Sequence, residues 1–253
     1  MLKQNSMKKL LPIVIFILLQ TVSSWGQQEA VTTLKTESGK IIRCFTTEKM
    51  VEAVAKNPDI RKRQALTEAR INRYIEQEKQ AFKGRTAPPV YTIPVVVHII
   101  YRTNAQNLSN QRVYEQLQVL NEDYRRTNSD AGNVPSAFAG VVADTEIEFC
   151  LATKDPSNNA TTGITRTQTT VTNIGGGNAY YSTAAGGINI WDPTKYLNIW
   201  VCELGGGVLG YTYTPGGAPN GADGVVIGYQ YFGKTGASAP YNGGRTTTHE
   251  VGH

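Results

Sequence analysis

The feature that most constrains this chain is the run His249-Glu250-Val251-Gly252-His253, its last five residues. Two histidines four positions apart lie one turn apart on the same face of a helix. This spacing lets both imidazoles bind one Zn²⁺ from a single rigid element, and it places Glu250 to take a proton from a zinc-bound water. The motif therefore predicts a helix that carries one catalytic zinc site, with His249 and His253 as ligands and Glu250 as the general base of peptide-bond hydrolysis.

The residues before the motif fit this interpretation. The apolar run 225–227 is expected to form a buried strand, and the Gly/Pro/Asn-rich stretch 233–244 is expected to form a loop. Thr246–Thr248 are candidate N-caps of the motif helix, and Thr247 has capping-box spacing to Glu250. A capping box is the alternative role for Glu250, and a chance match on a surface helix is the alternative for the whole motif. The order of strand, loop and capped helix favours the catalytic role.

The N-terminal residues have the pattern of an export signal. Three lysines precede the short apolar run 10–19, and small residues follow up to Gly26. A basic start, a short apolar core and small residues near a cut define a secretory signal peptide, which we place at residues 1–26. A membrane anchor is the alternative, although the apolar run is short for a bilayer. The chain is therefore expected to be secreted, without stable membrane insertion after signal cleavage.

The net charge of +5 is unevenly distributed. Residues 1–90 hold 16 Lys/Arg and 8 Asp/Glu, a net of +8, whereas residues 91–253 hold 9 Lys/Arg and 12 Asp/Glu, a net of −3. Because the basic excess lies outside the main domain, a nucleic-acid partner is not expected.

Residues 27–88 are predicted to be a helical propeptide. The stretch 67–82 has a thin apolar stripe among many charges, which suits a helix that lies on another surface but cannot make its own core. Pro88-Pro89 marks a boundary. A disordered linker is the alternative for this segment.

Residues 89–253 are predicted to form the main domain. The apolar run 94–101 reads as a strand covered on both faces, and Ser109 is expected to cap a helix whose buried stripe is Val113, Leu117, Leu120 and Tyr124. Two further strands are expected over 145–151 and 196–204, separated by a loosely structured excursion over 153–190. With an edge strand before 225–229, this order predicts an α/β fold with a mixed, mainly parallel sheet.

From Ile93 onward the chain resembles the pappalysin-type metalloproteases of the metzincin clan, and the bacterial cytophagalysin-like and ulilysin-like members in particular. The resemblance covers about 160 residues and rests on the stretches IPVVVHIIY, VLNEDYRRTN, DTEIEFCLA, TTGITRT, YLNIWVCELGGGVLGY, DGVVIGY and GRTTTHEVGH. It implies the N-terminal subdomain of a metzincin, with a twisted, mostly parallel sheet, a backing helix and an active-site helix.

The resemblance also implies features that follow the motif in metzincins, namely a third histidine ligand and a Met-turn. These would lie beyond His253, so we expect the chain to be a truncated piece of a longer protease that is inactive alone. The family further implies a propeptide cysteine that binds the zinc and blocks water. Cys44 lies in the right segment for this latency switch, and an incidental cysteine is the alternative.

Several other residues have predicted roles at or near the site. The glycine-rich stretch Gly206, Gly207, Val208, Leu209 and Gly210 is expected to form the exposed edge that pairs with the substrate strand. His98 sits in an apolar strand and is expected to be a buried structural residue. Cys150 and Cys202 lie on predicted strands, and a disulfide between them or with other cysteines remains open.

The sequence is compatible with two classes of function. The first is a secreted zinc metalloendopeptidase, made as a zymogen, that acts as a monomer on protein or peptide substrates. The second is a non-catalytic binding or adhesion module on a degenerate protease scaffold. One Zn²⁺ is the expected cofactor, and the sequence leaves open whether Ca²⁺ binds as well.

Overall fold

The computed structural model describes residues 40–81 and 89–253. The predicted signal peptide and the first and last parts of the predicted propeptide (residues 27–39 and 82–88) lie outside these residues. Within the described ranges, no helix is both long enough and apolar enough to cross a membrane.

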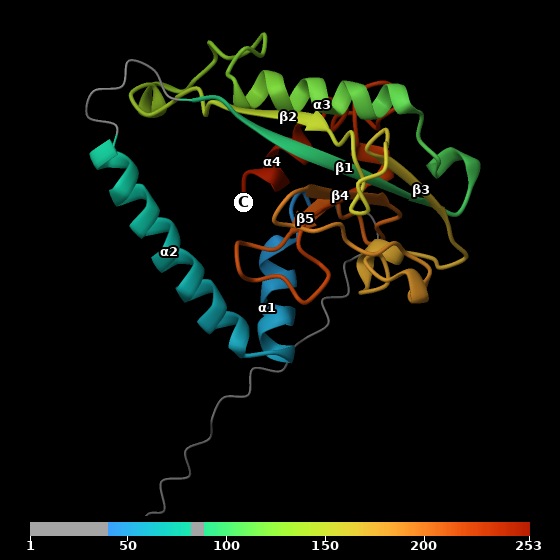
Figure 1. Cartoon of the computed structure of the whole chain (residues 1–253). Coiled ribbons are helices and arrows are strands. Elements are labelled where there is room, and N and C mark those ends of the chain that lie inside the picture. Colours follow the sequence, from blue (N-terminus) through green and yellow to red (C-terminus); the bar gives the residue numbers. More distant parts are fainter. Residues whose placement is uncertain (1–39, 82–88) are drawn as a thin grey trace, which may run out of the picture. The chain divides into compact units, whose positions relative to one another are not determined.

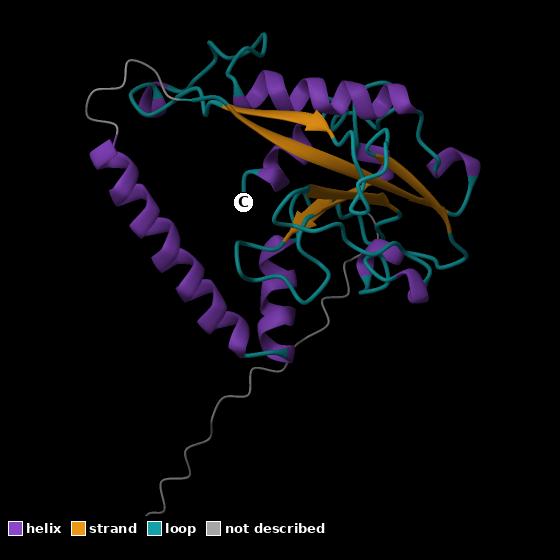
Figure 2. Cartoon of the chain, viewed as in Figure 1, coloured by secondary structure: helices purple, strands orange, loops and turns teal. Residues whose placement is uncertain are grey.

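A mixed six-stranded sheet organises the fold (Figures 1 and 2). The strand order is β2-β1-β4-β6-β5, and β3 also pairs with β1. The β5–β6 pair is antiparallel, and the other four pairs that join β1 to β2, β3 and β4, and β4 to β6, are parallel. The strands are β1 (Tyr91–Tyr101), β2 (Ile147–Leu151), β3 (Ile164–Gln168), β4 (Leu197–Cys202), β5 (Gly210–Thr212) and β6 (Val225–Gly228). The predicted mixed, mostly parallel α/β fold is confirmed.

Strand β1 is the longest strand and pairs on both of its sides. Its first half pairs with β2, its second half pairs with β3 along the same side, and β4 lies along the other side. The residues from Val95 to Ile100 are fully buried, as their continuous apolar run predicts. Strand β3 lies inside the predicted excursion over 153–190, so that stretch contains a strand the sequence analysis missed.

The described helices are α1 (Thr46–Lys56), α2 (Asp59–Ala81), α3 (Asn110–Tyr124) and α4 (Arg245–Val251). Ser109 caps α3 as predicted, because its side chain accepts a hydrogen bond of 3.4 Å from the Arg112 N–H. Helix α3 packs against the sheet face that carries Ile99 and Val201. Helix α1 covers the opposite face, where Ala53 joins the cluster around Trp200 and Tyr211. The sheet is therefore covered on both faces, which explains its continuous apolar strands.

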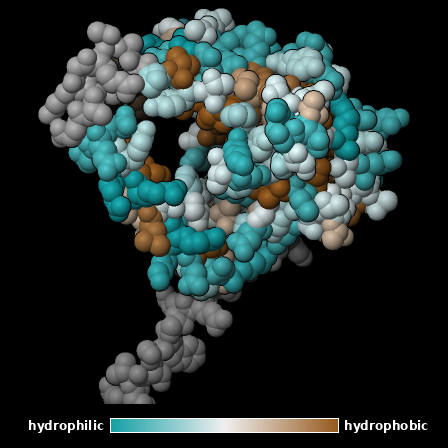
Figure 3. All heavy atoms as spheres, in the orientation of Figure 1, coloured by the Kyte–Doolittle hydropathy of each residue, from teal (hydrophilic) through white to brown (hydrophobic). Residues whose placement is uncertain are grey.

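Helix α2 confirms the predicted helix over 67–82 and begins earlier, at Asp59. Near its start, Arg63 donates a hydrogen bond to the Ala218 carbonyl and Gln64 donates one to Thr214. Further along, Leu66, Ile71, Tyr74 and Ile75 are exposed. Figure 3 shows small hydrophobic patches on the mainly hydrophilic surface of this helix. The thin apolar stripe is thus not covered by the described residues.

Candidate metal centre and active site

Helix α4 carries the histidine motif and packs against α3, β5 and β6. Its N-cap residue is Gly244, which has a φ of 73° and provides no side-chain cap. Thr246, Thr247 and Thr248 lie inside the helix, so the predicted threonine caps are wrong. The capping box, which was the alternative role for Glu250, is absent, because the Glu250 carboxylate is hydrogen-bonded to residues outside the helix. The hydroxyls of Thr247 and Thr248 instead donate to side chains of α3.

The helix ends at Val251, and His253 follows in a final turn in which its N–H contacts the Glu250 carbonyl at 3.4 Å. The two histidine rings remain neighbours, with centroids 4.8 Å apart and planes at 89°. Both histidines are exposed, whereas Glu250 between them is buried. The four-residue spacing therefore brings both imidazoles to one place, as the motif predicts.

Cys44 lies directly against this motif although it is more than 200 residues away in the chain. Its Sγ lies 3.2 Å from His253 Nε2, and its thiol donates to Glu250 Oε2 at 3.6 Å. The ligand atoms of Cys44, His249, Glu250 and His253 all lie within 4.8 Å of one another. The structure thus gathers the predicted ligands, base and thiol into one cluster.

The Glu250 carboxylate is enclosed between α4 and the segment that carries Cys44. Its Oε2 accepts a hydrogen bond of 3.2 Å from the Thr46 hydroxyl, and its Oε1 is buried without a hydrogen-bond partner. Burial raises the pKa of Glu250 to about 7, although the hydrogen bonds from Thr46 and Cys44 act in the opposite direction. A carboxyl group with this pKa can both accept and return a proton near neutral pH.

Burial also shifts the pKa values of the two neighbouring groups. The pKa of the Cys44 thiol is raised, first by burial and further by the charge of Glu250. The pKa of His253 is lowered by burial and by the nearby His249. A lowered pKa favours the neutral imidazole, which is the form that binds a metal.

The segment before α1 pairs with the glycine-rich stretch that was predicted to hold substrate. Ile42 donates its N–H to the Gly207 carbonyl at 2.9 Å, accepts from the Leu209 N–H at 2.9 Å, and forms a parallel bridge with Val208. Phe45 donates to the Gly210 carbonyl at 3.0 Å. The predicted edge is therefore covered by the chain itself, and Val208 and Leu209 are buried.

A cavity of about 470 Å³ lies beside His249, and Arg43 and Cys44 line part of it. The Arg43 guanidinium lies 5.7 Å from the centroid of the Tyr241 ring, which is a cation–π arrangement. Residues of α4 and of the loop before it form the remaining wall, including Pro240, Gly243, Arg245 and Thr246. This cavity is large enough for part of a peptide and borders the metal cluster.

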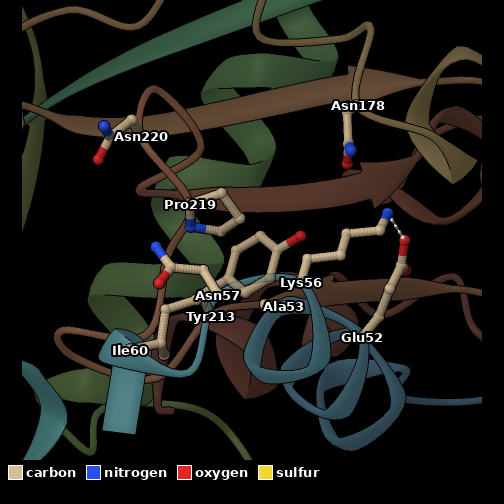
Figure 4. A pocket seen from close by; sticks show the side chains of 9 residues that line it. All are labelled: Glu52, Ala53, Lys56, Asn57, Ile60, Asn178, Tyr213, Pro219 and Asn220. Carbon is tan, nitrogen blue, oxygen red and sulfur yellow. Dashed lines mark hydrogen bonds and ion pairs between the residues drawn. The ribbon is translucent and has the colours of Figure 1, made fainter. Parts of the chain in front are cut away.

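A smaller cavity of about 180 Å³ lies between α1, the start of α2 and the loop that follows β5 (Figure 4). Tyr213, Pro219 and Ile60 border it, and the ion pair between Lys56 and Glu52 lies at its rim at 2.5 Å. None of its lining residues belongs to the metal cluster, so it is a feature of the helix packing rather than of the candidate active site.

His98 is buried away from the cluster, as predicted. Its Nδ1 lies 2.8 Å from the Thr165 hydroxyl and its Nε2 lies 3.1 Å from the Asn198 side-chain oxygen. Burial lowers the pKa of His98 to about 4, so the ring is neutral at pH 7. With both nitrogens hydrogen-bonded inside the sheet, His98 is a structural residue.

All three cysteines lie in the described residues and are free. Cys150 is exposed on β2, whereas Cys202 is buried on β4. The disulfide that the sequence left open is therefore not formed between them. Burial raises the pKa of Cys202 well above its ordinary value, so this thiol stays protonated.

Thr46 is a site residue that sequence reasoning missed. Its hydroxyl donates to Glu250 and accepts the Thr212 N–H at 3.0 Å, which ties the start of α1 to both the carboxylate and β5. Its place two residues after Cys44 is the single sequence signal for this role. That signal is weak because a threonine at the start of a helix is ordinarily interpreted as an N-cap residue.

The fold and the cluster together have the features of a metalloprotease. The structure of mature mirolysin from Tannerella forsythia, in complex with a cleaved peptide, is 46% identical; the match covers 66% of this chain and 63% of that chain, with a TM-score of 0.62. A Tannerella forsythia promirolysin mutant is 41% identical over 83% of this chain and 67% of that chain, with a TM-score of 0.65. An extracellular metalloprotease of Arthroderma otae is 44% identical over 61 residues, which is 22% of each chain. No family model matches the chain.

The chain therefore belongs to the metalloproteases, in the family of mirolysin and its precursor. It spans 63% of the mature mirolysin chain and 22% of the extracellular metalloprotease.

The clustered side chains fit a zinc ion. Histidine nitrogen and cysteine sulfur are the ligand types that Zn²⁺ takes in proteins. Their ligand atoms lie close to one another, and the buried Glu250 Oε1 has no partner within the described residues. An unpaired buried carboxylate oxygen beside two imidazoles is the arrangement expected where a cation belongs.

Proposed function

We propose that this chain supplies the zinc-binding helix and the general base of a secreted, pappalysin-type metalloendopeptidase. The observation that carries the proposal is the cluster of His249, Glu250, His253 and Cys44, with ligand atoms within 4.8 Å of one another on a fold similar to that of mirolysin. The alternative, a binding module on a degenerate scaffold, is not favoured because both histidines and the carboxylate are present together.

Zinc held by His249 and His253 would supply Lewis-acid chemistry, polarising the scissile carbonyl and lowering the pKa of water. Glu250 accepts a proton from the attacking water and passes it to the leaving amine. Its carboxylate is suited to both steps, because burial keeps its pKa near 7.

A catalytic zinc has three protein ligands, and the third histidine of this sequence, His98, is buried elsewhere. We therefore expect the 253-residue chain to be inactive by itself. Calcium binding remains an open expectation.

We further propose that residues 27–88 are a propeptide that keeps the enzyme latent, with residues 89–253 as catalytic domain and residues 1–26 as signal peptide. The proposal is supported by the contact of Cys44 with His253 and by the Thr46 hydroxyl on Glu250. Together these side chains contact His253, which would bind the metal, and the carboxylate that would receive a proton. The thiolate would take the ligand position that water needs, and Cys44 is the latency switch.

The proposed substrate is a peptide that pairs with residues 206–210 after the propeptide leaves. The propeptide segment already uses the outward backbone groups of this stretch, namely the carbonyls of Gly207 and Gly210 and the N–H of Leu209. The N–H of Val208 points to the Gly205 carbonyl instead, so it is not available for pairing. A monomer that binds peptides in extended form fits this arrangement, and no nucleic-acid partner is proposed.

The decisive experiment is the Glu250→Gln substitution in the protein as it is produced by its natural organism. Glutamine keeps the size and a hydrogen-bond acceptor for Thr46 but cannot accept the proton, so hydrolysis of a peptide substrate should fall by at least about a hundredfold. Zinc content, measured by atomic absorption, should be unchanged. Glu148→Gln, on β2 in the proposed catalytic domain and outside the metal cluster, is the control and should keep the original rate. An undiminished rate in Glu250→Gln, or protease activity in a zinc-free preparation, would reject the proposal.

A further inference from the structure

A buried amide behind the active-site helix takes no part in the proposed reaction. Gln116 lies on α3 and its side chain is 1% exposed. Its Nε2 donates to the Gly244 carbonyl at 2.9 Å. Its Oε1 accepts from the Gly233 N–H at 2.8 Å and from the Thr247 hydroxyl at 2.9 Å.

These three partners all belong to one functional unit. Gly233 and Gly244 are the two ends of the loop that walls the cavity beside His249, and Thr247 is in the first turn of α4. Thr247 is itself 0% exposed and lies two residues before His249. A single side chain therefore fixes both ends of the loop and the start of the helix that presents the motif.

The partners require an amide at this position. One side of the group faces a carbonyl, which needs a donor, and the other side faces an N–H and a hydroxyl, which need an acceptor. A carboxylate would repel the Gly244 carbonyl, and an apolar side chain would leave three buried polar groups without partners. Efficient packing of α3 against α4 would not by itself require one donated and two accepted hydrogen bonds at this position.

A second residue of α3 contacts the next position of α4. Asp123 lies two turns after Gln116 on the same helix and accepts a hydrogen bond of 2.7 Å from the Thr248 hydroxyl. Asp123 also pairs with Arg245 at 2.9 Å. The two α3 residues thus hold consecutive threonines just before His249, which defines both the position and the rotation of α4.

We propose that Gln116 is a positioning residue for the metal site: its amide sets the orientation in which α4 presents His249 and Glu250. This inference rests on the proposed zinc-dependent function. It predicts that loss of the amide weakens metal binding and alters the geometry of the bound ion, even where the protein remains folded.

The experiment is Gln116→Met in the 253-residue chain, titrated with Co²⁺ as a spectroscopic substitute for Zn²⁺. Methionine keeps the length of the side chain and removes all three hydrogen bonds. Co²⁺ should bind about tenfold more weakly, in line with the effect of residues that orient metal ligands, and its visible absorption should change shape. Gln118→Met is the matched control, because Gln118 is exposed on the same helix and, among the described residues, its side chain bonds only to Glu122.

Thr247→Val serves as the second variant, since it removes one of the three bonds without changing size. It should weaken Co²⁺ binding by a smaller factor. If Gln116→Met does not fold, the Co²⁺ affinity of Thr247→Val tests the positioning role instead. A folded variant with a lower melting temperature but the original Co²⁺ affinity and spectrum would show a merely structural role and overturn the inference. Failure of the unaltered chain to bind Co²⁺ would instead count against the proposed function itself.

Discussion

Glu250 and His98 are both buried ionisable side chains, but their surroundings differ. Glu250 has one carboxylate oxygen with no partner in the described residues, next to two exposed histidines and a thiol. His98 has both ring nitrogens hydrogen-bonded inside the sheet. An incompletely paired buried carboxylate is costly unless a ligand completes it, which supports the role proposed for Glu250, whereas the paired His98 belongs to the core.

The His98 environment predicts a pH dependence of stability. Burial holds its folded pKa at about 4, below the ordinary value of 6.5, so the unfolded chain binds the proton more tightly. Its contribution is therefore fully present above pH 6.5 and is lost as the pH falls from about 6.5 to about 4, amounting to about 3 kcal/mol of unfolding free energy.

Urea unfolding at pH 7 and pH 4.5 measures this effect. The His98→Gln variant lacks the titrating ring, so its stability should change less between the two pH values than that of the unaltered chain. Equal changes in both proteins would mean that His98 does not cause the loss.

At the scale of secondary-structure elements, the central observation is that the segment before α1 pairs with the stretch 207–210, which leads into β5. Gly207 makes this possible, because a Cβ atom there would lie 2.1 Å from the Lys40 carbonyl oxygen. Its φ of 71° also favours glycine. The close approach of one backbone to another at this edge is what the glycine-rich sequence predicts, although the approaching backbone is the chain's own.

Gly207→Ala tests whether this edge also receives substrate. In the active enzyme, the added methyl group should obstruct the backbone of a bound peptide, so KM should rise while kcat changes little. Gly236→Ala is the matched control, because its φ of 74° imposes similar strain but the nearest atom to a Cβ there is 3.7 Å away. An unaltered KM in Gly207→Ala would contradict the proposed substrate edge.

At the scale of the whole molecule, the cluster joins parts of the chain that are far apart in sequence. Cys44 and His253 are 209 positions apart, and Thr46 and Glu250 are 204 apart. Because the two ends of the described chain meet at one point, a metal bound there would link them and favour the folded state through its binding free energy.

Cys44→Ser is therefore expected to weaken Zn²⁺ binding by the 253-residue chain by at least about tenfold, because a hydroxyl is a poorer zinc ligand than a thiolate. In the uncleaved protein as its source makes it, the same change should raise peptide hydrolysis, since water then reaches the metal. Competition with a chromophoric chelator gives the zinc affinity. Cys150→Ser, at an exposed position on β2, is the control and should match the unaltered chain. Equal affinity for the Cys44 and Cys150 variants would argue against the latency switch.

The sequence by itself determined the mostly parallel sheet, α3 with its Ser109 cap, and the histidine pair. These features follow from local periodicity and from ligand spacing on one helix, which a linear pattern records directly. It also indicated that His98 is structural, because an apolar strand on both sides implies burial. Strand β3 was missed because four of its five residues are polar and it lies within a polar, glycine-rich stretch.

Only the tertiary structure decided how α4 begins and what surrounds Glu250. Thr247 and Thr248 are of a residue type that is preferred at N-caps. Their hydroxyls instead donate hydrogen bonds to side chains of α3, so tertiary contacts override the local preference. The structure likewise brought Cys44 and Thr46 to the motif and placed Gln116 behind it. Such contacts join residues more than 100 positions apart, and their free energies depend on packing that no local pattern of residues encodes.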